Sequence, residues 1–144
     1  MKINAIDMKI IKILEKNGRI PNNEIASMLS ISPGTVRNRI NKLIDNNLLK
    51  VKGLINPDEG TNNQFIYILV TLEKTHQWKS IAQKISKLPN VKSVSMITGR
   101  FALILELFID PHLLIDFLTN VMGNVNEVSS TETLVTVMNY NKWV

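Results

Sequence analysis

The chain has 144 residues, of which 44% are hydrophobic and 20% charged, and its net charge is +5. This composition is typical of a folded protein with one domain or two small ones, and it excludes a disordered chain. The absence of cysteine excludes disulfides, thiolate zinc sites and cysteine nucleophiles.

No segment suggests a membrane span or an export signal. The longest apolar run, residues 101–109, is interrupted by Glu106 and is shorter than the roughly 18 residues that suggest a span. The first 18 residues scatter charges among apolar residues, so they lack the apolar core of a secretory signal. We therefore expect a cytoplasmic protein.

The basic residues are concentrated near the N-terminus. Residues 1–60 hold ten Lys/Arg and six Asp/Glu, an excess of +4, while residues 61–144 hold seven and six, an excess of +1. Residues 30–52 alone hold five Lys/Arg against Asp45, again +4. Such clustering suits a phosphate backbone, although a single charge run is more often a solvated helix face.

Three helices are predicted in the first 47 residues. The first contains the apolar stripe of Ile6, Ile10, Ile13 and Leu14, with Asn4 or Asp7 available as its cap and Asn17-Gly18 as its stop. The second begins near Pro21-Asn22 and has Ile25, Ala26 and Leu29 on one side. The third runs from Pro33 to Asn46 after the cap Ser32, with Val36, Ile40, Leu43 and Ile44 inward. We interpret residues 1–47 as a helix-turn-helix DNA-binding domain.

The third helix presents polar side chains of the types that read DNA. Its outward residues are Thr35, Arg37, Asn38, Asn41 and Lys42. Arg binds guanine edges and Asn binds adenine edges in bidentate fashion, so Arg37 and Asn38 are the predicted base readers. Arg39 is weighed equally as a phosphate contact and as a structural partner of Asp45 or the first helix. Further predicted DNA contacts are Ser32, Arg19, Asn22 and Asn23.

The pattern changes from helical to extended after Leu48. Residues 48–57 are predicted to form a hinge strand, and a polar linker follows it, so that hinge strand and linker together span 48–63. Strands are predicted at 64–73, 91–97, 101–109 and 131–140. One helix is marked by Trp78, Ile81, Ala82, Ile85 and Leu88, and a second, after Asp110-Pro111, by Leu113, Leu114, Phe117, Leu118 and Val121. The order predicts an α+β fold, with residues 64–144 forming a ferredoxin-like βαββαβ antiparallel sheet.

The predicted strands at 64–73 and 101–109 carry apolar residues on both faces, which predicts self-association. Helices cover one face of such a sheet, so an apolar second face needs another partner. We expect a second copy of the chain to cover it, through Phe65, Tyr67, Leu69, Phe101, Leu103 and Leu105. Glu106, a lone carboxylate in an apolar strand, is expected to pair with a lysine across the dimer rather than with a ligand amine.

The chain resembles the Lrp/AsnC (feast/famine) family of transcriptional regulators over nearly its whole length. The resemblance rests on "IDMKIIKILEKNGR" (6–19), "NEIASMLSISPGTVRNRINKL" (23–43), "LLKVKGLINP" (48–57) and "LPNVKSVSMITGRFALIL" (88–105). It implies regulators that bind double-stranded DNA, dimerise through the sheet, often assemble as tetramers or octamers, and commonly respond to an amino acid bound between dimers. Thr98, Gly99, Arg100, Phe101 and Ala102 are the implied effector residues.

The sequence departs from the family pattern at three positions. Pro21 replaces a serine cap, so the cap of the second helix is expected to shift to Asn22. Ser30 replaces a glycine at a left-handed turn position. Ala102 stands where members carry an acidic residue, so either the ligand is not an amino acid bound in the usual way, or residues 98–102 serve only as a hairpin and assembly contact.

We predict a sequence-specific DNA-binding regulator that is not an enzyme. The alternatives are an architectural protein with little base preference, a protein-interaction helix, and a relative of the family's tetrapyrrole decarboxylases. Enzymatic chemistry is ranked last because it would favour a basic pocket that contains histidine, and the second half of the chain has only His76 and His112, each alone near a predicted helix start. No metal, other cofactor or catalytic residue is expected.

Overall fold

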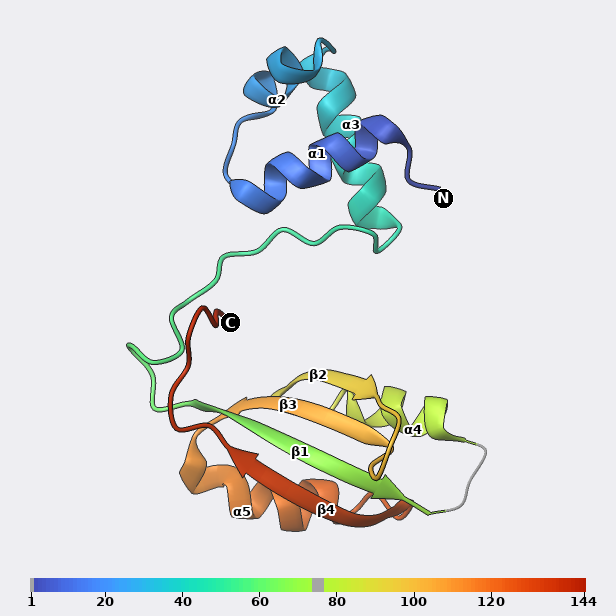
Figure 1. Cartoon of the computed structure of the whole chain (residues 1–144), viewed down its shortest axis with the longest axis vertical. Helices are drawn as coiled ribbons and strands as arrows, with labels where there is room; N and C mark the ends of the chain where they lie inside the picture. Colours follow the sequence, from blue (N-terminus) through green and yellow to red (C-terminus); the bar gives the residue numbers. More distant parts are fainter. Residues whose placement is uncertain (1, 74–76) are drawn as a thin grey trace. The chain divides into compact units, whose positions relative to one another are not determined.

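The computed structural model describes residues 2–73 and 77–144, and it divides the chain into two compact units, Met1–Gly53 and Leu54–Val144. The first unit is helical, and the second contains a sheet with helices (Figure 1). His76, expected at the surface, lies outside the described residues. No helix in the described part of the chain is long and apolar enough to span a membrane.

The first unit is a bundle of α1 (Ala5–Lys16), α2 (Asn22–Leu29) and α3 (Pro33–Asp45). The side chain of Asn4 caps α1, and Asp7 completes the capping box by accepting from the Asn4 backbone N–H. The Ser32 hydroxyl accepts from the Thr35 N–H and caps α3. Both of these predicted caps are confirmed. The core residues Ile10, Ile25, Ala26 and Val36 are at most 3% exposed.

Two expectations for this unit are wrong. Asn22 is the first residue of α2 rather than its cap; the cap position is Pro21, whose side chain cannot accept a hydrogen bond. Ile44, expected inward, is 42% exposed, whereas its neighbour Leu43, also expected inward, is 0% exposed. The left-handed turn at Ser30 is confirmed by its φ of 53° and ψ of 45°.

The second unit contains a four-stranded antiparallel sheet in the order β2-β3-β1-β4. The strands are β1 (Gln64–Leu72), β2 (Val91–Met96), β3 (Leu103–Ile109) and β4 (Val128–Val135). The predicted α+β, ferredoxin-like class is confirmed. The last strand lies at 128–135 rather than 131–140, because its pairing with β1 runs from Val128, opposite Leu72, to Val135, opposite Ile66.

Both helical segments pack on one face of the sheet (Figure 1). They are α4 (Trp78–Ile85) and the run of η1 (Pro111–Leu113), α5 (Leu114–Asp116) and η2 (Phe117–Met122). Phe117 and Met122 are each 2% exposed in the core, whereas Leu113, expected inward, is 54% exposed. Leu113 lies in a tight 3-10 turn at the start of the run, and this turn directs it away from the sheet.

The predicted hinge strand at 48–57 is absent from the described residues, which form no strand between α3 and β1. An extended segment becomes a strand only beside a second strand. Here one residue finds such a neighbour: Ile55 and Val144 exchange backbone hydrogen bonds of 2.9 and 3.2 Å. The C-terminal tail, residues 136–144, therefore ends beside the linker that enters the second unit.

Candidate functional site

The outward face of α3 carries four polar side chains that the rest of the chain leaves free. Arg37, Asn38, Asn41 and Lys42 are exposed, and none has a side-chain hydrogen bond or ion pair with another described residue. Spacings of three and four residues place them side by side on the helix. The chain therefore presents two cations and two amides on one continuous surface.

Ser32 and Thr35 are engaged with each other at the start of the same helix. Their hydroxyl oxygens lie 2.8 Å apart, and the Ser32 oxygen also accepts from the Thr35 N–H at 3.1 Å. These hydroxyls stabilise the helix start, where unpaired N–H groups otherwise face solvent.

Arg39 has a structural partner in the first helix. Its Nη1 lies 2.7 Å from Asp7 Oδ1 and 3.3 Å from Asn4 Oδ1. Of the two partners considered from the sequence, the first helix is found and Asp45 is not. The Asp7 side chain is 0% exposed while that of Arg39 is 27% exposed, so part of the guanidinium still faces solvent.

Burial alone would raise the pKa of Asp7. The Asn4 backbone N–H and the Arg39 guanidinium outweigh this effect and hold the pKa of Asp7 below its ordinary value. Asp7 is thus ionised and paired at neutral pH, and it links the start of α1 to the middle of α3.

The start of α2 offers unbonded backbone donors. The N–H groups of Asn22 and Asn23 donate to no described residue, whereas those of Glu24 and Ile25 bond to Pro21 O. Arg19, in the preceding loop, is exposed. Free N–H groups at a helix start are suited to an anion such as a phosphate.

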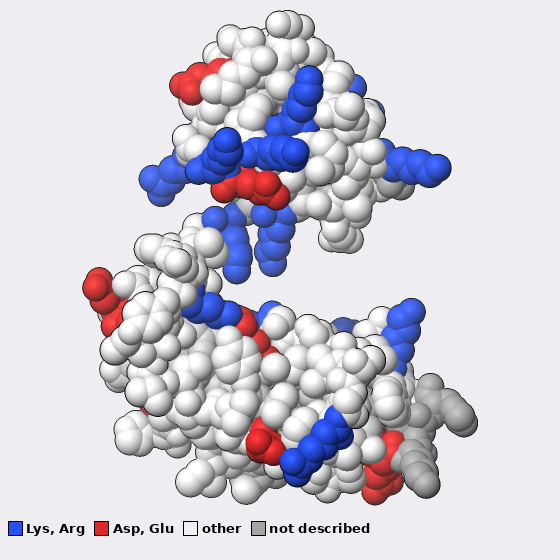
Figure 2. All heavy atoms as spheres, viewed as in Figure 1, with Lys and Arg blue, Asp and Glu red and all other residues white. Residues whose placement is uncertain are grey.

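Charge is distributed unevenly over the chain. Figure 2 shows several Lys and Arg side chains and fewer acidic ones on the visible face of the N-terminal unit, drawn at the top. The visible face of the other unit is largely uncharged. This distribution agrees with the sequence count of +4 for residues 1–60 and +1 for the remainder.

The sheet face opposite the helices, here called the open face, is partly covered by the chain itself. It carries Phe65, Tyr67 and Leu69 from β1, paired with Phe108, Glu106 and Ile104 from β3, and Leu134 from β4. Phe65 is 0% and Phe108 5% exposed, whereas Leu134 is 46% exposed. Tyr67, Leu69 and Ile104 are half-buried. An apolar area remains beside the covered end.

Lys142 of the C-terminal tail is bound to the open face. Its Nζ lies 2.5 Å from Glu106 Oε2, 3.3 Å from the Tyr67 hydroxyl and 4.4 Å from the centre of the Phe65 ring. Burial acts to lower the pKa of Lys142, but the hydrogen bonds to Glu106 and Tyr67 raise it above its ordinary value. Glu106 therefore pairs with a lysine of its own chain, not with one across a dimer as expected.

The expected interface residues do not share one face. Ile68 pairs with Leu105 and Val70 with Leu103, so Leu103 and Leu105 lie on the helix side, where both are 0% exposed in the core. The correction follows from register, because paired residues of an antiparallel sheet point to the same side. Phe101 lies before β3, half-buried, and Phe65 is covered. Tyr67 and Leu69 remain accessible.

A cavity of about 400 Å³ contains all five expected effector residues. We call it the effector cavity, and it is lined by Thr71, Leu72, Trp78, Ile97, Thr98, Gly99, Arg100, Phe101 and Ala102. The Arg100 guanidinium lies 5.2 Å from the centre of the Phe101 ring. The sequence did not assign Trp78 to this site, since its apolar spacing indicated only a helix; its position next to the loop depends on the fold of the sheet.

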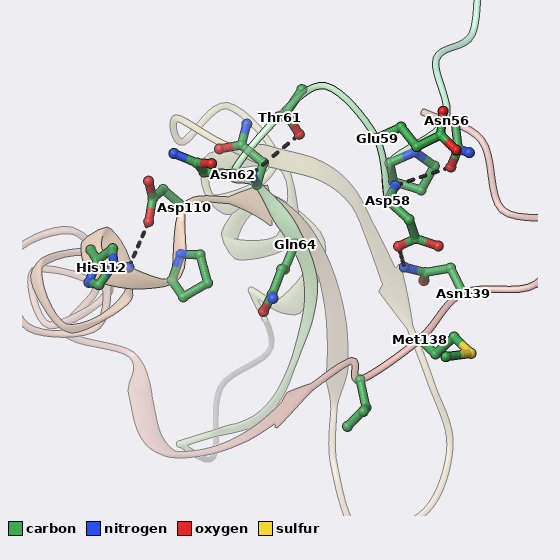
Figure 3. A pocket seen from close by; sticks show the side chains of 14 residues that line it. Asn56, Asp58, Glu59, Thr61, Asn62, Gln64, Asp110, His112, Met138 and Asn139 are labelled. Atoms are coloured by element: carbon green, nitrogen blue, oxygen red, sulfur yellow. Dashed lines mark hydrogen bonds between the residues drawn. The ribbon is translucent and has the colours of Figure 1, made fainter.

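A larger cavity, of about 880 Å³, lies between the linker residues 56–64, the turn at 110–112 and tail residues 137–139 (Figure 3). Its described lining residues include Asp58, Glu59 and Asp110, and none of them is Lys or Arg. Asp58 accepts a hydrogen bond from the Asn139 side chain at 2.7 Å, and Asp110 accepts from the His112 N–H at 2.9 Å. The first of these hydrogen bonds holds the tail to the linker, and the second lies within the turn at 110–112. No three His, Asp or Glu side chains in residues 2–73 and 77–144 could hold a metal ion.

Two family models match the chain. Residues 3–50 match the winged helix-turn-helix DNA-binding model, and residues 65–142 match the Lrp/AsnC ligand binding domain. The second match covers more than half of the 144 residues.

Curated and solved proteins agree with these models. The HTH-type transcriptional regulator LysM of Saccharolobus solfataricus is 35% identical over 69% of this chain and 68% of its own. The HTH-type transcriptional regulator FL11 of Pyrococcus furiosus is 25% identical over 92% of this chain and 88% of its own length. The crystal structure of the transcriptional regulator NMB0573/L-Met complex from Neisseria meningitidis is similar, with a TM-score of 0.76 and 22% sequence identity. The match covers 98% of this chain and 94% of that one.

Proposed function

We propose, from the premise that this chain belongs to the Lrp/AsnC family of transcriptional regulators, that α3 reads the operator through Arg37 and Asn38. The observation that carries this proposal is the free outward face of α3, since a side chain can bond a base edge only if its own fold leaves it unpaired. Asn41 and Lys42 extend the same surface and supply further base or phosphate contacts.

The proposed phosphate contacts come mainly from the start of α2 and from the loop that precedes it. The N–H groups of Asn22 and Asn23, the Arg19 side chain and the exposed part of Arg39 are the proposed donors. Ser32 and Thr35 are proposed to contribute to phosphate binding indirectly, because their hydroxyls stabilise the start of α3. Such contacts position the protein but carry little sequence information.

The DNA-bound form is proposed to contain paired copies of the chain. The uncovered part of the open face, with Leu69, Ile104 and Leu134, is the proposed contact between them. A two-fold pair of reading helices suits major-groove sites one helical turn, roughly 34 Å, apart. Tetramers or octamers built from such pairs are consistent with the family.

Small-molecule control is proposed to act at the effector cavity. The match to a ligand binding domain supports this, as does the L-Met complex of a structurally similar regulator. The cavity offers Arg100 as a partner for a carboxylate, the group that all amino acids contain.

Selection of bound fragments from random duplexes tests the proposed readers. We expect the wild-type chain to enrich one pseudo-palindromic motif, and Arg37→Ala or Asn38→Ala to lose preference at one base step of each half-site. Lys79→Ala removes an exposed cation from the second unit and serves as the charge control. An architectural protein would instead bind unrelated duplexes equally, and its variants would weaken all sequences alike. That outcome would contradict the proposed base readout.

A further inference from the structure

The lining of the effector cavity restricts the ligands that it can bind. Its volume of about 400 Å³ suits a small molecule rather than a peptide. Trp78, Phe101, Leu72 and Ile97 provide an apolar wall, and Trp78 is 38% exposed toward solvent. A planar or branched apolar group of a ligand can pack against this wall.

Arg100 is the one charged residue among the lining residues that the structure describes. It forms no ion pair with any described residue. Its guanidinium instead lies over the Phe101 ring, 5.2 Å from the ring centre, which holds it beside the cavity. An unpaired guanidinium next to an apolar wall is suited to a carboxylate, which it can bind through two parallel hydrogen bonds.

The loop at 98–101 adds neutral donors. Within the described residues, the N–H groups of residues 98 to 101 donate to no partner, although the loop is closed on both sides. The Ile97 N–H donates to Ala102 O at 3.0 Å, and the Ala102 N–H donates to Val70 O at 2.9 Å. Gly99 has a φ of 123° and no atom near the position of a side chain. Successive free N–H groups in a turn are common donors to anions.

A carboxylate that could pair with a ligand's ammonium group is missing from the described part of the same lining. Neither Asp nor Glu lines the described part of the cavity, and Ala102 presents only a methyl group. The hydroxyls of Thr71 and Thr98 are neutral acceptors, weaker than a carboxylate. The carboxylate of an α-amino acid would be engaged by Arg100, so its ammonium group would lie near this cation without a carboxylate of the lining to pair with.

We propose that the effector cavity binds a monocarboxylate that has an aromatic or branched apolar side group and no α-ammonium group, such as a 2-oxo acid or an aryl acid. This inference rests on the proposed function, because it names the ligand class of the same site. The carboxylate pairs with Arg100 and the loop N–H groups, and the side group packs on Trp78 and Phe101.

Calorimetric titration of the full chain with matched ligand pairs tests the proposal. The pairs are phenylpyruvate with L-phenylalanine, and 4-methyl-2-oxopentanoate with L-leucine, which differ only at the second carbon. We expect each oxo acid to bind at least about tenfold more tightly than its amino acid, as an unpaired charged group costs that much or more. Equal or tighter binding of the amino acids overturns the proposal, and so does the absence of binding by all four compounds.

Variants at two lining residues separate charge from shape. Arg100→Gln should weaken the oxo acids at least about tenfold, while Lys92→Gln, an exposed cation outside the lining, should not. Thr98→Asp adds an acceptor at an exposed lining position and should move the ratio of the two affinities toward one. Thr98→Asn has the same shape without the charge and should leave the ratio unchanged. An unchanged ratio in Thr98→Asp overturns the charge argument.

The proposed operator reading is tested independently. A preparation that selects a DNA motif but binds none of the four compounds overturns the ligand proposal alone. A preparation that binds the oxo acids but shows no base preference overturns the proposed reading of DNA and leaves the ligand class standing.

Discussion

Arg39 Nη1 lies 2.7 Å from Asp7 Oδ1, so the helix that carries the proposed base readers also carries a cation that is bound to the core of its own unit. Two arginines only two residues apart thus have different tasks. Arg37 faces solvent without a partner, whereas Arg39 neutralises a fully buried carboxylate.

Substitution of each arginine by methionine separates these tasks. Arg39→Met leaves Asp7 buried and unpaired, so we expect the free energy of unfolding of the first unit to fall by about 3 kcal/mol. Arg37→Met should leave it unchanged within about 0.5 kcal/mol and weaken operator binding. Urea denaturation followed by circular dichroism, with mobility shift assays on the same samples, measures both. Equal loss of stability in the two variants would contradict the assignment.

The pairing of Asp7 predicts acid sensitivity of the first unit. Because the folded state lowers the pKa of Asp7, the resulting stability is fully present above the unfolded pKa of about 3.9. It is lost as the pH falls through the lower, folded pKa. Thermal melts between pH 7 and pH 2 should therefore show a steeper loss in the wild type than in Asp7→Asn. Parallel curves for the two proteins would argue against this origin.

The contact of Lys142 with Glu106 predicts a tail that is released when either residue is neutralised. Both side chains are partly exposed, so Lys142→Met should cost at most about 1 kcal/mol of stability. Because the folded state raises the pKa of Lys142, this stability is fully present at pH values below the unfolded pKa of about 10.4. The stability is lost as the pH rises through the folded pKa. Limited proteolysis should cleave residues 136–144 faster in Lys142→Met and Glu106→Gln, with Lys79→Met as the control.

The two sides of the sheet predict two different defects. Leu69→Asp places a charge on the open face and should dissociate the proposed assembly into folded single chains. Leu103→Asp places a charge in the core, where the leucine is 0% exposed, and should unfold the second unit. Leu113→Asp, at a position that is 54% exposed, should change neither property. Light scattering and circular dichroism distinguish the cases, and an intact assembly in Leu69→Asp would exclude the open face as the contact.

The turn between α2 and α3 predicts a stabilising substitution. Ser30 has a φ of 53°, where a side chain costs about 1 kcal/mol relative to glycine. Its side chain makes no hydrogen bond with a described residue and is exposed, so Ser30→Gly should recover most of this cost. Denaturant titration is the measurement. A lower midpoint in the variant would show that the added freedom of the unfolded chain dominates.

Local signals in the sequence account for the parts of the fold that were predicted well. The caps at Asn4 and Ser32 depend on residues within four positions of one another, whereas the left-handed turn at Ser30 was implied by the family resemblance. The order of strands and helices follows from the same kind of information. The apolar runs in the second half of the sequence also located the strands, because such runs depend on neighbours along one strand.

The errors on the sheet and at the C-terminal tail arise because residues distant in the sequence decide the outcome. Alternation cannot show that Leu103 faces the helices while Tyr67 faces away, because this depends on the register between β1 and β3. Lys142 is 36 residues away from Glu106, and nothing near either residue indicates their pairing. The five expected effector residues are adjacent in sequence and were found together, whereas Trp78 joined them only through the fold.

The exchange of two backbone hydrogen bonds between Ile55 and Val144 places the entry and exit of the second unit side by side. Such closure allows the unit to be circularly permuted: a short bridge can join these two points, and new ends can be opened in an exposed loop. The first unit, with the helix proposed to read DNA, could then be joined to the second unit at a different loop. An engineered sensor could in this way be rewired without altering its ligand cavity.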